Sequence, residues 1–175
     1  MERLQQYDVV VVGGGTAGVS AAVGAAKTGA KTLLIERNAY LGGEATNSGV
    51  SAFCGFYTCG ENPVRVVEGV GRLVLNEMEA LGPTVDYVIS ATGNRNINFQ
   101  PEYLKCAMDN LLEKERVDYL LHTSVIGADT ENGTITAIHC VDDEGTFTVA
   151  AKAFVDASGD ANLARLAGAH LVWGG

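Results

Sequence analysis

Near the start of the chain, residues 9–18 read VVVVGGGTAG and residues 33–36 read LLIE. The four consecutive valines favour a buried strand, because β-branched side chains pack well on a pleated sheet. The glycines that follow predict a tight turn, and the alanine-rich segment from Val19 to Lys27 predicts a helix that stops at Thr28-Gly29. A second apolar run then ends in Glu36. Residues 8–36 therefore have the order strand, glycine-rich turn, helix, strand and acid.

This order and spacing are those of the G-x-G-x-x-G fingerprint of dinucleotide-binding βαβ units. Gly13 permits the turn, Gly15 leaves room for a pyrophosphate beside the backbone, and Gly18 lets the helix pack close to the sheet. The helix N-terminus offers free N–H groups and a partial positive charge to phosphates. Glu36 follows Gly18 by 18 residues, close to the usual spacing of about 20. Its carboxylate can accept both ribose hydroxyls of an adenosine, so we expect a dinucleotide-binding unit.

The residue type at position 36 bears on which dinucleotide is bound. An acid there disfavours a 2′-phosphate and therefore argues against NADP. Arg37 directly follows it, and a guanidinium is a suitable partner for a 2′-phosphate. NADP therefore stays open as an alternative on sequence grounds.

Composition narrows the class of protein. A chain of 175 residues that is 47% hydrophobic can form one domain with a substantial core. With 21 acidic and 12 Lys and Arg residues, the net charge of −9 disfavours binding to nucleic acid or to an anionic membrane. We find no apolar run long enough for a transmembrane helix and no apolar export signal at the N-terminus, so we expect a cytoplasmic location. The four cysteines are expected to be reduced thiols.

Beyond residue 36 the sequence predicts a long functional loop, two helices and a β-rich section. The Asn132-Gly133 pair is a strong hairpin signal, and Pro101 is favourable in the first turn of a helix. We expect a loop at 37–63, helices at 64–81 and 101–115, strands at 119–121, 125–129, 134–141, 146–150 and 152–156, and a helix at 161–167. The pattern of residues 84–100 is ambiguous: 85–89 is compatible with a strand, and 93–98 reads as a polar turn region. The fold class is therefore α/β: a Rossmann-like parallel sheet with a three-stranded antiparallel insertion.

Three segments carry a resemblance to a known family. They are residues 9–36, the segment ERNAYLGG at 36–43, and the segment FVDASGDANLA at 154–164. Together they resemble the FAD-binding half of the glutathione-reductase-like flavoprotein superfamily. More narrowly, they resemble the bacterial FAD-dependent oxidoreductases that have a late Asp-Ala-Thr-Gly-Asp box, with Ser158 where threonine is commoner. The resemblance covers nearly the whole chain, 1–175, as one FAD-binding domain.

The resemblance implies a role for each matching position. The first glycine loop, residues 13–18, would wrap the FAD pyrophosphate. Glu36 would hold the ribose, and the backbone of Val125 would meet the adenine. The second glycine pair, Gly42 and Gly43, would run beside the pyrophosphate or ribityl chain, with residues 44–48 near the flavin. Asp160 would bind the ribityl or pyrophosphate part from the start of a helix, where a carboxylate is favoured. The predicted cofactor-binding set is Gly13, Gly14, Gly15, Thr16, Ala17, Gly18, Glu36, Arg37, Gly42, Gly43, Glu44, Ala45, Thr46, Ser48, Val125, Ser158, Gly159 and Asp160.

Other reactive or aromatic residues lie in the long loop. Cys54 and Cys59 have the C-x₄-C spacing of the redox-active pair in the superfamily's disulfide reductases, but Cys54 falls eleven residues after Gly43 instead of almost directly. Two ordinary loop thiols are therefore the favoured interpretation, with a redox dithiol as the alternative. Phe56 and Tyr57 could pack on the isoalloxazine ring, although ordinary packing is favoured. No zinc-like ligand spacing is present, so no metal is predicted, and no residue is assigned as catalytic.

These observations favour the FAD-binding portion of a flavin-dependent oxidoreductase, which exchanges a hydride or electrons with a small-molecule substrate. The alternatives are an NAD-binding dehydrogenase domain and a non-catalytic nucleotide-binding subunit of a complex. The chain ends about fifteen residues after Asp160, where family members usually continue into a substrate domain. We therefore expect a second chain or domain to complete the substrate site, and we expect an oligomer.

Overall fold

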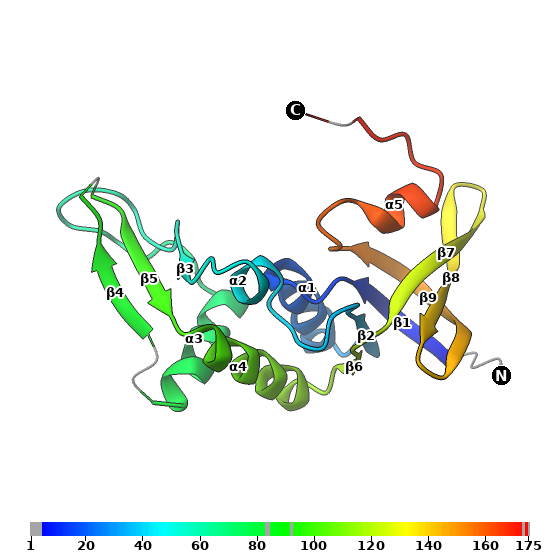
Figure 1. Ribbon diagram of the computed structural model, residues 1–175, viewed down its shortest axis with the longest axis horizontal. Coiled ribbons are helices and arrows are strands. Elements are labelled where there is room, and N and C mark those ends of the chain that lie inside the picture. Colours follow the sequence, from blue (N-terminus) through cyan, green and yellow to red (C-terminus); the bar gives the residue numbers. More distant parts are fainter. Residues whose placement is uncertain (1–4, 83–84, 92, 173, 175) are drawn as a thin grey trace.

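The computed structural model describes residues 5–82, 85–91, 93–172 and 174 (Figure 1). Within these residues a six-stranded sheet has the order β6-β2-β1-β9-β8-β7. The strands are β1 (Gln5–Val12), β2 (Thr32–Ile35), β6 (Asp118–Leu120), β7 (Ser124–Glu131), β8 (Thr134–Asp142) and β9 (Gly145–Asp156). Strands β6, β2, β1 and β9 are parallel, whereas β7, β8 and β9 form an antiparallel meander. The predicted α/β fold class is confirmed.

Strand β9 joins the meander to the parallel part of the sheet. Its first half pairs antiparallel with β8, with Ala150 opposite Ala137. Its second half pairs parallel with β1, with Asp156 opposite Val12. The separate strands predicted at 146–150 and 152–156 are thus one strand of 12 residues, because no turn residue interrupts the segment.

The two faces of β1 belong to two different cores. Val11 packs in a core with α1 (Thr16–Lys27), α3 (Val70–Ala80) and α4 (Pro101–Lys114). Val10 and Val12 pack on the other face, under the meander and α5 (Asn162–Leu166). A strand covered on both faces reads as a continuous apolar run rather than an alternating one, which accounts for the four valines.

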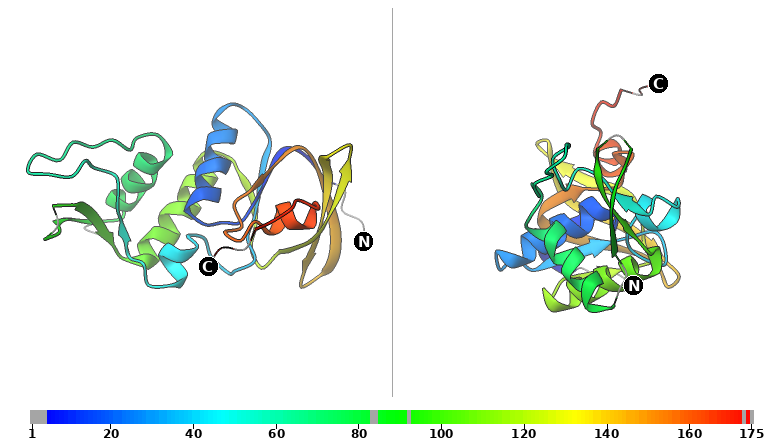
Figure 2. Two further views of the ribbon diagram at one scale, coloured as in Figure 1. Left: turned by 90° about the horizontal axis from the view of Figure 1, so that it is seen from above. Right: turned by 90° about the vertical axis from the view of Figure 1, so that its left-hand side faces the viewer.

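A second sheet within the described residues has the order β3-β5-β4 and is antiparallel. Its strands are β3 (Ala52–Phe53), β4 (Val85–Ile89) and β5 (Arg95–Phe99). The polar turn predicted at 93–98 is wrong for most of its length, because Ile97 and Phe99 are buried and alternate with asparagines in a strand pattern. Figure 2 shows this sheet at the opposite end of the molecule from the meander.

Three helices begin at a different residue from the one that the sequence predicted. Helix α1 begins at Thr16, directly after the glycine loop. Helix α3 begins at Val70, not at 64, because Gly69 has a positive φ of 66°, which no residue of a right-handed helix adopts. Helix α5 begins at Asn162, because Ala161 is left-handed with φ of 53°, so Asp160 precedes this helix instead of starting it. No helix in the described residues is long and apolar enough to cross a membrane.

Candidate functional site

The loop between β1 and α1 packs tightly against the end of β9. A Cβ atom on Gly18 would overlap the carbonyl oxygen of Gly13, and one on Gly13 would overlap the carbonyl oxygen of Ala157. Gly13 also has φ of 104°, which L-residues with a side chain rarely adopt. The close packing that the sequence predicted for Gly18 is therefore confirmed.

The N-terminus of α1 is open to a ligand. Its N-cap is Gly15, and no side chain caps it. Thr16 and Ala17 in its first turn are exposed, and first-turn N–H groups have no acceptor within their own helix. This end can therefore receive an anion through its amides and its dipole.

The second glycine pair lies directly against the first loop. Gly42 forms a parallel bridge with Gly15, and its N–H donates to the carbonyl of Gly14 at 2.8 Å. A Cβ atom on Gly43 would come within 3.0 Å of Gly15 Cα. The tertiary fold thus brings the two predicted glycine segments together.

The short helix α2 (Glu44–Asn47) continues from the second glycine pair. Glu44 and Ser48 are exposed, whereas Ala45 is buried. The hydroxyl of Thr46 donates to the carbonyl of Leu41 at 2.8 Å, so this side chain already has a local structural partner. The cofactor contacts implied for these residues stay predictions.

The carboxylate of Glu36 is buried, with 6% of the residue exposed. Its Oε2 accepts a hydrogen bond of 2.6 Å from the Gly14 N–H. Its Oε1 accepts two bonds of 2.7 Å, from the N–H and the side-chain amide of Asn38. A carboxylate has about four acceptor positions, so one is left. One ribose hydroxyl can be accepted directly, and a second requires the Asn38 side chain to move.

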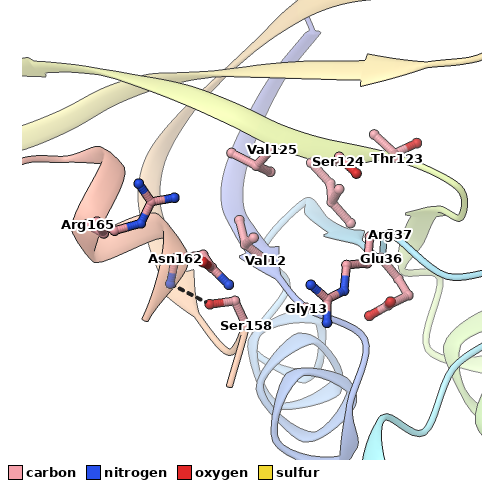
Figure 3. A pocket seen from close by; sticks show the side chains of 11 residues that line it. Val12, Gly13, Glu36, Arg37, Thr123, Ser124, Val125, Ser158, Asn162 and Arg165 are labelled. Atoms are coloured by element: carbon pink, nitrogen blue, oxygen red, sulfur yellow. Dashed lines mark hydrogen bonds between the residues drawn. The ribbon is translucent and has the colours of Figure 1, made fainter. Parts of the chain in front are cut away.

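Glu36 lies at one side of a pocket of about 210 Å³ (Figure 3). The pocket is formed where β1, β2 and β9 end and β7 begins, with α5 closing one side. Its lining residues are Val12, Gly13, Ile35, Glu36, Arg37, Thr123, Ser124, Val125, Ser158, Asn162 and Arg165. The fold therefore brings five residues of the predicted set together: Gly13, Glu36, Arg37, Val125 and Ser158. The sequence analysis missed Asn162 and Arg165, although their i, i+3 spacing after the late box indicates one helical face.

The late box, which is Asp-Ala-Ser-Gly-Asp at residues 156–160, holds α5 in place through hydrogen bonds centred on Asp156. Its Oδ1 accepts from the Ser158 N–H at 3.0 Å and the Ser158 hydroxyl at 2.6 Å, and its Oδ2 accepts from the Ala164 N–H at 2.8 Å. The Ser158 hydroxyl in turn accepts from the Asn162 N–H at 2.8 Å. Partial burial opposes ionisation of Asp156, but hydrogen bonds from Ser158, Ala164 and Leu163 outweigh it and lower its pKa. Asp156 is thus a structural anchor that the sequence analysis missed.

Asp160 lies outside the Glu36 pocket. It is exposed and lines a separate hollow with Ala161, Leu171 and Val172. Gly159 beside it is exposed and left-handed, with φ of 86°. Neither residue lines the Glu36 pocket, and the roles implied for them toward FAD stay predictions.

A second pocket of about 330 Å³ lies beyond the N-terminal turn of α1. It is mainly apolar, with two hydroxyl side chains from α1, and is lined by Thr16, Ala17, Ser20, Phe53, Phe56, Val67, Gly71, Val74 and Met108. The rings of Phe53 and Phe56 lie 5.7 Å apart between centroids. Tyr57 is not part of this lining. Its ring instead packs against the guanidinium of Arg95, whose Cζ lies 4.8 Å from the ring centroid.

The two loop cysteines are exposed free thiols. The Sγ of Cys59 lies 2.8 Å from Oδ1 of Asn94 and donates to it. Across the described residues, no three His, Cys, Asp or Glu side chains gather in an arrangement that could hold a metal ion.

The fold and the glycine-lined site define an α/β protein of the dinucleotide-binding class. The chain belongs to the FAD-dependent oxidoreductase family, whose model matches residues 8–175. It is 30% identical over 125 residues to digeranylgeranylglycerophospholipid reductase of Methanospirillum hungatei, covering 71% of this chain and 26% of that protein. It is 53% identical over 49 residues to glutathione reductase of Yarrowia lipolytica, and this match covers 28% of this chain and 10% of that protein.

A similar solved structure is a geranylgeranyl bacteriochlorophyll reductase-like protein from Thermoplasma acidophilum. The TM-score is 0.65 at 23% identity, and the match covers 95% of this chain and 43% of that one. This likeness shows the fold. The chain matches between 8% and 26% of the length of its curated relatives, so it corresponds to a part of those proteins.

Proposed function

We propose that this chain binds FAD in an extended conformation and is the FAD-binding portion of a flavin-dependent oxidoreductase. The observation that carries the proposal is the position of the uncapped α1 N-terminus between two pockets. Gly13 lines the Glu36 pocket, whereas Thr16 and Ala17 line the apolar pocket. A ligand with a nucleoside at one end, a diphosphate in the middle and an apolar ring at the other end matches this order.

The residues present fit the parts of FAD. The buried carboxylate of Glu36 has an acceptor position left for a ribose hydroxyl, and Val12 and Val125 offer apolar contact to adenine in the same pocket. The first turn of α1 offers N–H donors to the diphosphate. The apolar pocket, with Phe53 and Phe56, offers aromatic contact to an isoalloxazine ring.

When bound, FAD supplies hydride and electron-pair transfer. The chain's own residues bind the cofactor, orient it through the two glycine loops, and offer apolar contact in the second pocket. No residue is proposed as an acid or base. The apolar second pocket favours a flavin over a nicotinamide, because the larger three-ring isoalloxazine can make more contact with its two phenyl rings.

We further propose that a second domain or chain completes the substrate site. Several large apolar side chains near the apolar pocket and the second sheet are exposed: Val64 at 64%, Val66 at 59% and Ile89 at 60%. Apolar surface of this kind is typical of regions that another surface covers. A small-molecule substrate would then be selected by residues that this chain does not supply.

The test is calorimetric titration of the purified protein with FAD, ADP, FMN and NAD, together with a visible absorbance spectrum after addition of FAD and removal of excess. The proposal expects FAD to bind most tightly, and ADP and FMN each to bind more weakly, because each fills part of the site. A folded protein that binds NAD in preference to FAD would favour the dehydrogenase alternative. A folded protein that binds ADP but neither FMN nor FAD more tightly would indicate a nucleotide-binding subunit without a flavin site.

A further inference from the structure

Strand β4 is an outer strand of the second sheet, and among the described residues no strand pairs with its outer side. The sheet has the order β3-β5-β4, so β5 covers one side of β4. Figure 1 shows β4 beyond β5, at the end of the molecule away from the six-stranded sheet. Tyr87, Val88 and Ile89 of this strand are exposed by 37%, 42% and 60%. The outer side of β4 is therefore open to pairing with another strand.

The hydrogen bonds of the β4–β5 hairpin show which backbone groups of β4 face outward. In an antiparallel pair, residues that exchange hydrogen bonds alternate with residues that do not. The Ser90 N–H donates to the Asn94 carbonyl at 2.8 Å, where β4 ends. Counting back from this bond along the regular register of β4 and β5, every second residue of β4 directs its N–H and C=O away from β5. These residues are Val85, Tyr87 and Ile89.

The other outer strands of the two sheets are protected against such pairing. Strands β3 and β6 have two and three residues. Strand β7 has eight residues, but its register with β8 shifts between Val125 and Gly127 and again between Asp129 and Thr130. Short strands and bulges are the devices by which natural sheets prevent contact between their edges. Strand β4 has neither protection, because all five of its residues pair with β5 in an unbroken register.

The sequence VDYVI of β4 is complementary to itself in an antiparallel pair. With a two-fold axis beside Tyr87, the outward groups of Tyr87 meet those of Tyr87 in a second copy, and Val85 meets Ile89. Asp86, the one charged residue of the strand, then lies opposite Val88. Like charges that face one another across two strands destabilise the pair, and this register places none together.

We propose that β4 pairs antiparallel with β4 of a second copy of this chain, so that two three-stranded sheets become one six-stranded sheet in a symmetric dimer. A stable interface buries about 800 Å² on each partner, and a strand of five residues supplies only part of such an area. We therefore expect a weak dimer whose population rises with protein concentration. The pairing is independent of the proposed binding of FAD.

The experiment is sedimentation equilibrium of the purified chain over a range of concentrations, for the wild type, Val88→Asp, Val88→Lys and Ile126→Asp. Both Val88 variants place a charge at the same exposed position, but only the acid would face Asp86 of the second copy with a like charge. We expect Val88→Asp to weaken the dimer about tenfold, because the repulsion occurs twice in a symmetric pair. Val88→Lys should dimerise at least as strongly as the wild type, because it faces Asp86 with an opposite charge.

Ile126→Asp is the matched control. Ile126 is 52% exposed on β7, so this variant makes the same change of charge on the outer strand of the other sheet. It should dimerise as the wild type does. Circular dichroism and thermal unfolding confirm that each variant is folded.

Each other outcome overturns the proposal. A folded wild type that stays monomeric at every concentration would leave β4 to a strand of a different polypeptide. Equal weakening by Val88→Asp and Val88→Lys would exclude the register about Tyr87, and weakening by Ile126→Asp would place the interface on β7. Assemblies larger than a dimer would also contradict it, because the pairing uses β4 of both copies. Titration of the same samples with FAD is a separate readout: a chain that dimerises as expected but binds no FAD would fail only the proposed function.

Discussion

The backbone N–H of Gly14 donates a 2.6 Å hydrogen bond to Oε2 of Glu36, although the two residues lie 22 positions apart. The bond ties the acid that ends β2 to the glycine loop that follows β1. It turns the carboxylate toward the loop and fixes the loop in the same step. The ribose-binding acid and the phosphate-binding loop are therefore one structural unit.

Glu36→Gln should weaken both the fold and nucleotide binding. The amide cannot accept at all the positions that the carboxylate uses, so a charge-assisted bond to Gly14 or Asn38 is lost. We expect a loss of about 1–3 kcal/mol in unfolding free energy and a weaker affinity for adenosine and ADP alike. Urea unfolding and calorimetry measure the two effects. Glu131→Gln, on the exposed end of β7, is the control. Equal unfolding free energies and affinities for the two variants would contradict the role given to Glu36.

Gly18→Ala and Gly24→Ala in the same helix should have opposite effects. A Cβ atom on Gly18 overlaps the carbonyl oxygen of Gly13, whereas one on Gly24 meets no atom within 4 Å. We expect Gly18→Ala to destabilise the protein by about 2 kcal/mol or more, through strain in a packed region. Gly24→Ala should stabilise it by about 0.5–1 kcal/mol through helix propensity. Chemical denaturation measures both, and a neutral Gly18→Ala would show that the loop has room to relax.

Ser20→Phe should weaken the binding of FAD without changing the binding of ADP. Ser20 lines the apolar pocket but not the Glu36 pocket, and a phenyl ring there would occupy the space proposed for the isoalloxazine. We expect FAD affinity to fall about tenfold or more, toward that of ADP, because the flavin's contribution to binding is lost. ADP affinity should be unchanged and serves as the internal control. If FAD still binds as tightly as in the wild type, the flavin ring does not use this pocket.

Asp156 should contribute stability that depends on pH. Its folded-state pKa is lowered, against the effect of burial, by the hydrogen bonds from Ser158, Ala164 and Leu163. The contribution is therefore complete above the ordinary carboxyl pKa of 3.8 and is lost as the pH falls through the lowered value. Unfolding free energies of the wild type and Asp156→Asn, measured near neutral pH and at about pH 3, should differ more at neutral pH. A difference that does not change with pH would contradict this role.

The thiols should fall into two reactivity classes. Burial, with a smaller contribution from Asp142, raises the pKa of Cys140 to about 12, and thiolates are the reactive species. Cys54, Cys59 and Cys106 are exposed. A thiol reagent at neutral pH should therefore titrate three groups in the native protein and all four after unfolding. Rapid reaction of a fourth group in the folded state would show that the core around Cys140 opens.

The elements of the first motif and the β7–β8 hairpin were predictable from the residues themselves. The valine run, the glycine turn, the helix ending at Lys27 and the Asn132-Gly133 hairpin all have short-range causes in backbone sterics and apolar periodicity. The second sheet was not predicted, because β3 has two residues and β5 contains polar asparagines. Their strand conformation depends on pairing with each other and with β4, which no local pattern encodes.

Part of the candidate site could likewise be predicted from the sequence, and part could not. Sequence alone determined the glycine loop, the acid at position 36 and the late box, because tight turns, helix N-termini and strand ends constrain which residue types can occupy them. Only the tertiary structure decided that Arg165 and Asn162 enter the Glu36 pocket, that Asp156 anchors α5, and that Asp160 faces elsewhere. The physical reason is the left-handed Ala161, which reorients the chain after Asp160 and aims α5 at the pocket. A conformation that one residue adopts because its neighbours pack around it cannot be read from residue spacing.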